Sequence, residues 1–143
     1  MKFSFLQENL SKGLQTIMHA VPTKSSLPIL SNVLIETEKG RIKLSATNLE
    51  TAITTYVGAS VEESGSITVP AKLLKDFISN LSPGTLEAQT KDEILIISSK
   101  TTKSRFNGNS SKDFPNLPTF PKDAKGLSID PATLNEVINI VAF

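Results

Sequence analysis

The sequence predicts an α+β fold in which two amphipathic helices pack on one face of an antiparallel sheet. Three observations predict it. A short strand that runs directly into an amphipathic helix occurs three times, at a spacing of roughly 60 residues. Segments of alternating apolar and polar residues follow the first two helices. The chain has 143 residues, which suits one domain, or one domain with the beginning of a second.

The three strand–helix copies share one apolar stripe. Its spacing of i, i+3, i+4 and i+7 marks one face of an α-helix. The strands are expected at 2–5, 66–69 and 127–130, and the helices at 6–20, 70–81 and 131–141. The stripes are Leu14, Ile17, Met18 and Val21, then Leu74, Phe77, Ile78 and Leu81, and finally Leu134, Val137, Ile138 and Val141. The recurrence indicates a duplicated supersecondary unit, with chance repetition of a common junction as the alternative.

Strand-like segments complete each half. They are expected at 32–38, 41–46 and 51–57 in the first half, and at 85–90, 93–99 and 102–107 in the second. Lys39–Gly40 and Lys91–Asp92 provide hairpin turns. The acidic pairs Glu62–Glu63 and Asp92–Glu93 are expected to be solvated charges in turns. Each half is therefore predicted as a strand, a helix and three antiparallel strands.

The predicted domain boundaries follow from proline. Residues 1–112 form the first domain, and residues 113–125 form a linker in which Pro115, Pro118 and Pro121 exclude a regular helix or a central strand. Residues 126–143 begin a second domain with a strand and a helix. An apolar helix of about a dozen residues is marginal in water without a packing partner. We therefore expect the chain to be a fragment of a longer protein.

Composition excludes several classes of function. The chain has no Cys and one His, so no disulfide framework, thiolate site or multi-histidine metal site is expected, and no cofactor. No apolar run reaches the roughly 18–20 residues that span a bilayer. The amino terminus lacks a signal-peptide core because Gln7 and Glu8 interrupt it. A cytoplasmic protein without membrane contact is expected. His19 is the candidate general base of a hydrolase. A surface or helix-end histidine without a catalytic role is the favoured interpretation of this residue.

Basic residues are few, and the net charge is only +1. The candidate DNA-contacting residues are Lys12, Lys24, Lys72 and Lys75, which lie on or after the first two helices. If the helices share one exposed face, these lysines form a weakly positive surface that contacts phosphates without reading base sequence. A solvated helix face is the alternative interpretation. Only 6% of the residues are aromatic, so stacking on single-stranded bases is not expected.

Five motifs together resemble the bacterial DNA polymerase III beta subunits, the replicative sliding clamps. They are LPILSN at 27–32, ATNLE at 46–50, VPAK at 69–72, KSRF at 103–106 and DFPNL at 113–117. The resemblance implies the DNA-clamp fold. It also implies subunits of three similar domains, two of which close head to tail around duplex DNA with helices lining the hole. Such a clamp has no catalytic step and tethers the polymerase, a nucleotidyltransferase, by topology.

The resemblance also implies roles for individual residues. Lys24 and Lys72 correspond to positions that contact DNA. The residues that correspond to the interface with a second subunit are Leu73, Phe77, Lys103, Ser104, Arg105 and Phe106. Phe106 is expected to insert into that subunit, and Gly108 stands where the family often has a larger apolar residue.

The resemblance further implies two protein partners, the catalytic subunit of DNA polymerase III and the clamp loader. Their peptide pocket lies between the second and third domains, outside this chain. The fragment is therefore expected to associate only weakly. An α+β interaction module that uses an exposed edge strand and does not bind DNA is the alternative function.

Overall fold

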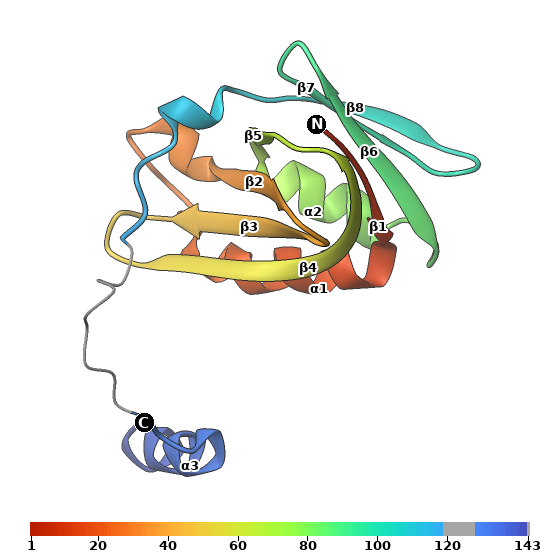
Figure 1. Cartoon of the computed structure of the whole chain (residues 1–143). Helices are drawn as coiled ribbons and strands as arrows, with labels where there is room; N and C mark the ends of the chain where they lie inside the picture. Colours follow the sequence, from red (N-terminus) through yellow and green to blue (C-terminus); the bar gives the residue numbers. More distant parts are fainter. Residues whose placement is uncertain (119–127, 143) are drawn as a thin grey trace.

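The computed structural model describes residues 1–118 and 128–142. Its eight strands form one antiparallel sheet in the order β5-β2-β3-β4-β1-β6-β7-β8. The helices α1 and α2 lie next to each other on one face of this curved sheet (Figure 1). The predicted α+β class is therefore confirmed.

Each half of the domain contains one strand, one helix and three further strands, as the duplication predicts. The first half contains β1 (Lys2–Leu6), α1 (Gln7–Ile17), β2 (Asn32–Glu38), β3 (Arg41–Thr47) and β4 (Ala52–Glu63). The second contains β5 (Ser66–Pro70), α2 (Ala71–Ser79), β6 (Thr85–Lys91), β7 (Ile94–Ser98) and β8 (Lys103–Asn107). Within the described residues, the other elements are the short 3₁₀ helices η1 (Met18–Ala20), η2 (Pro28–Ser31) and η3 (Ser111–Asp113) and the helix α3 (Pro131–Val141).

The two halves exchange their first strands. β1 pairs with β6 of the second half as well as with β4, and β5 pairs with β2 of the first half. The same backbone hydrogen bond occurs in both halves. In the first half Ala59 of β4 donates its N–H to the carbonyl of Gly40, in the turn before β3. In the second half Gly108, just after β8, donates to the carbonyl of Glu93, in the turn before β7. This exchange makes one sheet of the two units.

The core lies between the sheet and the two helices. Leu14 and Ile17 of α1 and Leu74 and Ile78 of α2 have no exposed surface, and they belong to one cluster with the inward side chains of the strands. The first two predicted stripes therefore face the same core. α1 approaches the sheet closely because position 13 is glycine: a Cβ there would lie 2.7 Å from Cγ2 of Val57.

Some boundaries differ from the sequence-based expectation. α1 ends at Ile17 and α2 at Ser79, so Val21 and Leu81 extend the stripes beyond the helices. β4 continues to Glu63, and the pair Glu62–Glu63 therefore ends a strand and does not occupy a turn. The reason is that β1 provides a pairing partner for residues 59–63.

The end of β4 is also held by charge. Lys2 Nζ lies 2.6 Å from a carboxylate oxygen of Glu62, and this hydrogen bond raises the pKa of the exposed Lys2 ammonium. The amino-terminal ammonium lies 3.6 Å from Glu63. Exposed pairs of this kind stabilise a fold only slightly.

The expected linker and second-domain segment are described only in part. Phe114 is 5% exposed and therefore packs on the first domain. Residues 119–127 lie outside the described part of the chain. Most of the expected linker and Leu127 of the expected strand are among these residues. Residues 128–130 are not in a strand, because no neighbouring strand pairs with them within the described ranges. α3 forms as expected, and its apolar side chains are exposed.

Candidate nucleic-acid face and subunit edge

The exposed face of α1 and α2 carries the candidate DNA-contacting lysines. The start of α1 lies against the end of α2, where Gln7 donates its Nε2 hydrogen to the carbonyl of Ile78 at 2.7 Å. The two helices therefore pack against each other on this face. Lys12 on α1 and Lys72 at the start of α2 are exposed, and so is Lys24 in the loop after η1.

The net charge of this helix face is weakly positive. Lys75 is half-buried and lies 3.6 Å from the carboxylate of Asp76, which offsets its charge. Lys12, Lys24 and Lys72 make no ion pair with any residue in the described ranges. Mobile ammonium groups of this kind can contact phosphates without fixed geometry, which suits sequence-independent contacts.

The strand β8 is an open edge of the sheet. It pairs with β7 on one side, and a single bridge between Thr68 and Asn109 joins its far end to β5. Because Gly108 donates to Glu93, the alternation of an antiparallel ladder directs the backbone groups of 103, 105 and 107 away from β7. These groups can therefore accept a further strand. The side chains of Lys103 and Arg105 are exposed, and Ser104 is half-buried.

Phe106 does not protrude from this edge, and its expected insertion into a second subunit stays a prediction. The ring is 4% exposed and packs edge-on against Phe77, with 5.3 Å between the ring centroids. Alternation along β8 explains this orientation, because position 106 faces the helices while 105 and 107 face solvent. Leu73, one helical turn before Phe77, is 58% exposed and is the large apolar side chain that this region presents to solvent.

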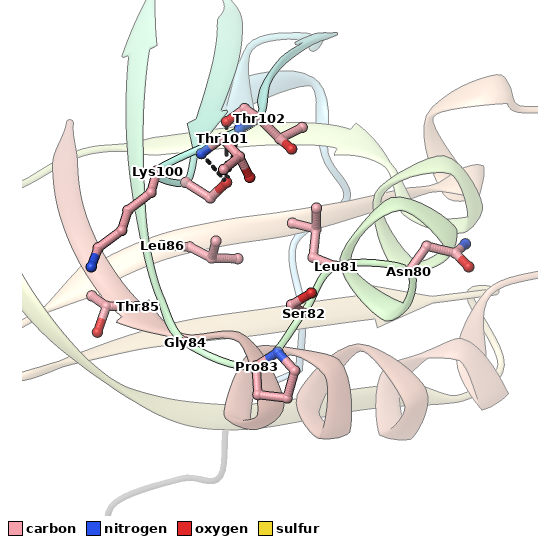
Figure 2. Close-up of a pocket in the computed structure, with 11 residues that line it drawn as sticks. Asn80, Leu81, Ser82, Pro83, Gly84, Thr85, Leu86, Lys100, Thr101 and Thr102 are labelled. Atoms are coloured by element: carbon pink, nitrogen blue, oxygen red, sulfur yellow. Dashed lines mark hydrogen bonds between the residues drawn. The ribbon is translucent and has the colours of Figure 1, made fainter.

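A hollow of about 480 Å³ lies beside the start of β8 (Figure 2). The loop between α2 and β6 forms one wall, and the turn between β7 and β8 forms the other. Leu81 and Leu86 line it with apolar surface, and Lys100 is its charged residue. In this turn, Ser99 Oγ accepts hydrogen bonds from the backbone N–H groups of Thr101 and Thr102. The hollow therefore adds a concave surface next to the edge strand.

The hydrolase hypothesis gains no support. His19 is exposed in η1, and no hydrogen bond or ion pair joins its side chain to another residue in the described part of the chain. Within residues 1–118 and 128–142, no group of three His, Asp or Glu side chains could hold a metal ion. No helix in these ranges is long and apolar enough to cross a membrane.

Sequence reasoning missed a partly buried polar cluster just beyond the end of β8. Asn32, Thr68 and Asn109 meet there and are linked by hydrogen bonds. Each residue stands alone in its own segment, and the three are separated by up to 77 positions along the chain. Asn32 at the start of an apolar strand was the one local signal, because asparagine is rare in buried strands.

The comparisons with known proteins agree with this geometry. The family model of the DNA polymerase III beta subunit, N-terminal domain, matches residues 1–118. The beta sliding clamp of Synechocystis is 35% identical over 95% of this chain and 37% of its own length. The crystal structure of the DNA polymerase III subunit beta from Pseudomonas aeruginosa has a TM-score of 0.87 at 29% identity, over 97% of this chain and 38% of that one.

A second solved structure agrees equally well. A putative DNA polymerase III beta subunit from Eubacterium rectale has a TM-score of 0.88 at 30% identity, covering 96% of this chain and 38% of that one. The chain thus spans less than two fifths of the length of the relatives that it matches. With the family model matched over the whole of the folded first domain, this chain belongs to the DNA polymerase III beta subunit family.

Proposed function

We propose that this chain forms the first part of a sliding-clamp subunit, which encircles duplex DNA as a head-to-tail dimer and tethers the replicative polymerase. The observation that carries the proposal is the duplicated unit, whose two equivalent helices lie together on one face of one sheet. Repetition of such domains around a ring would place every helix pair on the inner wall. Because the chain spans about 37% of the Synechocystis relative, the activity belongs to the longer subunit.

The helix face is proposed as the part of the inner wall that touches DNA. Lys24 and Lys72 are the main contacts, and Lys12 and Lys75 contribute less. A clamp that is held by topology needs only weak contacts, because strong neutralisation of phosphates would slow its movement along DNA. The weakly positive face meets this requirement, and tethering raises the effective concentration of the polymerase at the primer end.

The β8 edge is proposed as the closing surface for a second subunit. Its outward backbone groups at 103, 105 and 107 would pair with an edge strand of the partner. The basic side chains of Lys103 and Arg105 favour an acidic partner strand, because opposite charges across a strand pair are stabilising. Leu73, which is exposed near Phe77, is proposed as the apolar anchor of this closing surface, because Phe106 is packed against Phe77 in the core.

The remaining partners follow from the family. The clamp is a non-catalytic accessory of a DNA-directed DNA polymerase, which is the nucleotidyltransferase, and it acts in the bacterial cytoplasm. The clamp loader and the catalytic subunit would bind to parts of the longer subunit that follow this chain. No cofactor is required for a role based on topology.

The test uses the full-length subunit loaded on DNA by its clamp loader. A topological clamp is retained on nicked circular DNA and is lost within minutes after the circle is cut with a restriction enzyme. Gel filtration of the loaded complex measures the retained fraction. Equal retention on circular and linear DNA would overturn the proposal and indicate ordinary affinity for DNA.

A charge-reversal pair locates the DNA contacts. Lys24→Glu with Lys72→Glu is expected to lower loading on primed DNA several-fold. The matched control is Lys39→Glu with Lys91→Glu, which changes the net charge equally at an exposed turn residue and at the exposed last residue of β6. The control is expected to load normally. Equal losses in both pairs would mean that total charge decides loading and that the helix face is not special.

A protein-interaction module without DNA binding is the second candidate function. The open β8 edge beside the exposed Leu73 favours it, because such an edge can recruit a strand from any partner. The two candidates differ in one result. If the helix-face reversal leaves DNA loading intact while Leu73→Ala abolishes assembly, the interaction module is the better description.

A further inference from the structure

The end of the β8 edge is fixed by a partly buried polar cluster and a single bridge, and not by a longer strand ladder. Asn32, Thr68 and Asn109 form this cluster, where the chain leaves β8 and passes β5. Thr68 is fully buried and Asn32 is 6% exposed, whereas Asn109 is exposed. Buried polar side chains are costly unless each is hydrogen-bonded, so a cluster of this kind depends on its geometry.

Every hydrogen bond of the cluster crosses between separate segments. Thr68 and Asn109 exchange two backbone hydrogen bonds, of 3.1 and 2.9 Å. Thr68 Oγ1 also donates to the carbonyl of Asn109 at 3.2 Å. The Nδ2 group of Asn32 donates to Oδ1 of Asn109 at 3.2 Å and to Oγ1 of Thr68 at 3.3 Å. The cluster therefore ties the end of β8 to β5 and β2 at once.

The approach of the two segments is so close that it requires glycine at position 108. A Cβ there would lie 2.5 Å from the carbonyl oxygen of Thr68 and 2.8 Å from Ile67. This contact explains why this chain has no larger apolar residue at Gly108. The backbone at Gly108 therefore packs directly against the backbone of Thr68.

The other half of the domain solves the same problem differently. There Ser4 of β1 pairs with Ser60 of β4, at the place that corresponds to Thr68 and Asn109, and the ladder continues to Glu63. In the second half the chain turns into η3 at Ser111, so only the one bridge forms. Side-chain hydrogen bonds thus stand where the first half has further strand pairs.

We propose that the Asn32–Thr68–Asn109 cluster is a latch that fixes the position of the open β8 edge for its partner strand. The inference rests on the proposed function, in which β8 receives a second subunit. β5 ends at Pro70, so no neighbour supports residues 103–107 from the outer side. The latch anchors the strand immediately beyond this unsupported stretch. The three residues are positioning residues, because they act through the strand.

Hydrogen exchange of backbone amides in the 143-residue chain tests the latch without any partner. Thr68→Val keeps the shape of the side chain and removes the hydroxyl. We expect exchange at Phe106 and Gly108 to become about fivefold faster or more, because both hydrogen bonds of the Thr68 hydroxyl are lost locally. Exchange at Leu44 in the central strand β3 is expected to stay unchanged. Thr68→Ser restores the hydroxyl and is expected to restore slow exchange.

Three further variants keep the result specific. Ser45→Ala removes an equally buried hydroxyl, which pairs with Thr54 at 3.0 Å in the other half, and it is expected to leave β8 exchange unchanged. Asn109→Ala is expected to accelerate β8 exchange, whereas Asn109→Asp keeps an oxygen that accepts from Asn32 and is expected to do so less. Uniform acceleration at all amides, or the same β8 acceleration in Ser45→Ala, would overturn the latch.

The functional arm uses the full-length subunit and follows dissociation of its dimer on dilution by fluorescence energy transfer. Thr68→Val is expected to accelerate dissociation severalfold, with rescue by Thr68→Ser. Accelerated exchange with unchanged dissociation would overturn the role of the latch in subunit closure. An unsubstituted subunit that forms no dimer would overturn the proposed closing surface instead, so the two failures are distinguishable.

Discussion

At the scale of single residues, Phe106 shows how alternation along a strand decides the role of a side chain. Its ring is buried against Phe77, whereas the side chains of its neighbours at 105 and 107 are exposed. A motif match locates such a residue in a functional segment but does not tell which face it occupies. The packing of the neighbouring helix determines that face.

Phe106→Ala therefore tests stability more than association. We expect a loss of about 3–5 kcal/mol in the free energy of unfolding, because the ring leaves a cavity in the core. The measurement is urea denaturation of the 143-residue chain, followed by circular dichroism. Leu73→Ala is the matched control and is expected to change stability by less than about 0.5 kcal/mol, as exposed substitutions usually do. Similar losses in both variants would contradict the burial of Phe106.

Asp130 provides a pH-dependent contribution to the start of α3. Its carboxylate accepts hydrogen bonds from the backbone N–H and the hydroxyl of Thr133, at 2.9 and 3.1 Å, and these bonds hold the pKa of Asp130 below its usual range. Because the folded form favours the charged carboxylate, the stabilisation is present at neutral pH and is lost as the pH falls through the lowered pKa.

Nuclear magnetic resonance measures this effect directly. The Asp130 carboxyl is expected to titrate at a lower pH than an aspartate in a short peptide, and the helical shifts of residues 131–134 are expected to decrease together with it. Asp130→Asn keeps a capping side chain without titration and is expected to remove the pH dependence. An ordinary pKa for Asp130 would contradict the cap.

At the scale of elements, the distance between α1 and the sheet depends on Gly13. Gly13→Ala is expected to lower the free energy of unfolding by about 1–3 kcal/mol, because the new methyl group would overlap Val57. Gly58→Ala in β4 is the matched control, since nothing lies within 4 Å of its added Cβ. Thermal unfolding of both variants checks the expectation. A stable Gly13→Ala variant would mean that α1 can move away at little cost.

The elements that the sequence predicts best are those that local patterns determine. Period-two alternation with a Gly40 turn located β2 and β3 within one residue, and the helical stripes located the buried faces of α1 and α2. The length of β4 was underestimated, because its last residues are polar and form a strand only beside β1. The 3₁₀ helix η2 was missed for a similar reason, since local periodicity does not mark so short an element.

At the scale of the whole molecule, the candidate site was predictable where it depends on the repeat. Matching stripes placed α1 and α2 on one face, and with them the exposed Lys12 and Lys72. The latch was not predictable, because Asn32, Thr68 and Asn109 come together only when the two halves exchange their first strands. Pairwise contacts across 36 and 77 positions leave no local pattern in a single sequence.

The open β8 edge also needs protection from pairing with its own copies. In an antiparallel pair of two β8 strands centred on Arg105, that residue would face the same arginine of the other copy. Like charges directly opposite each other are destabilising, and basic residues on edge strands are a common means of preventing such pairing. The same charges favour an acidic partner strand. The side chains of Lys103 and Arg105 therefore both favour the partner strand and disfavour pairing with another copy of β8.

Neutralising the edge is therefore expected to increase self-association. Lys103→Thr with Arg105→Thr keeps good strand formers and removes both charges. We expect the 143-residue chain to dimerise at a concentration up to about fivefold lower, because up to roughly 1 kcal/mol of repulsion between the two facing Arg105 side chains is relieved. Analytical ultracentrifugation measures the association constant. Lys39→Thr with Lys91→Thr removes the same charge from two exposed positions outside β8. The exposed apolar side chains of α3 are the same in both double variants, so a difference between them is due to the β8 edge. If both pairs associate equally, net charge controls association, and the basic residues of β8 do not protect the edge.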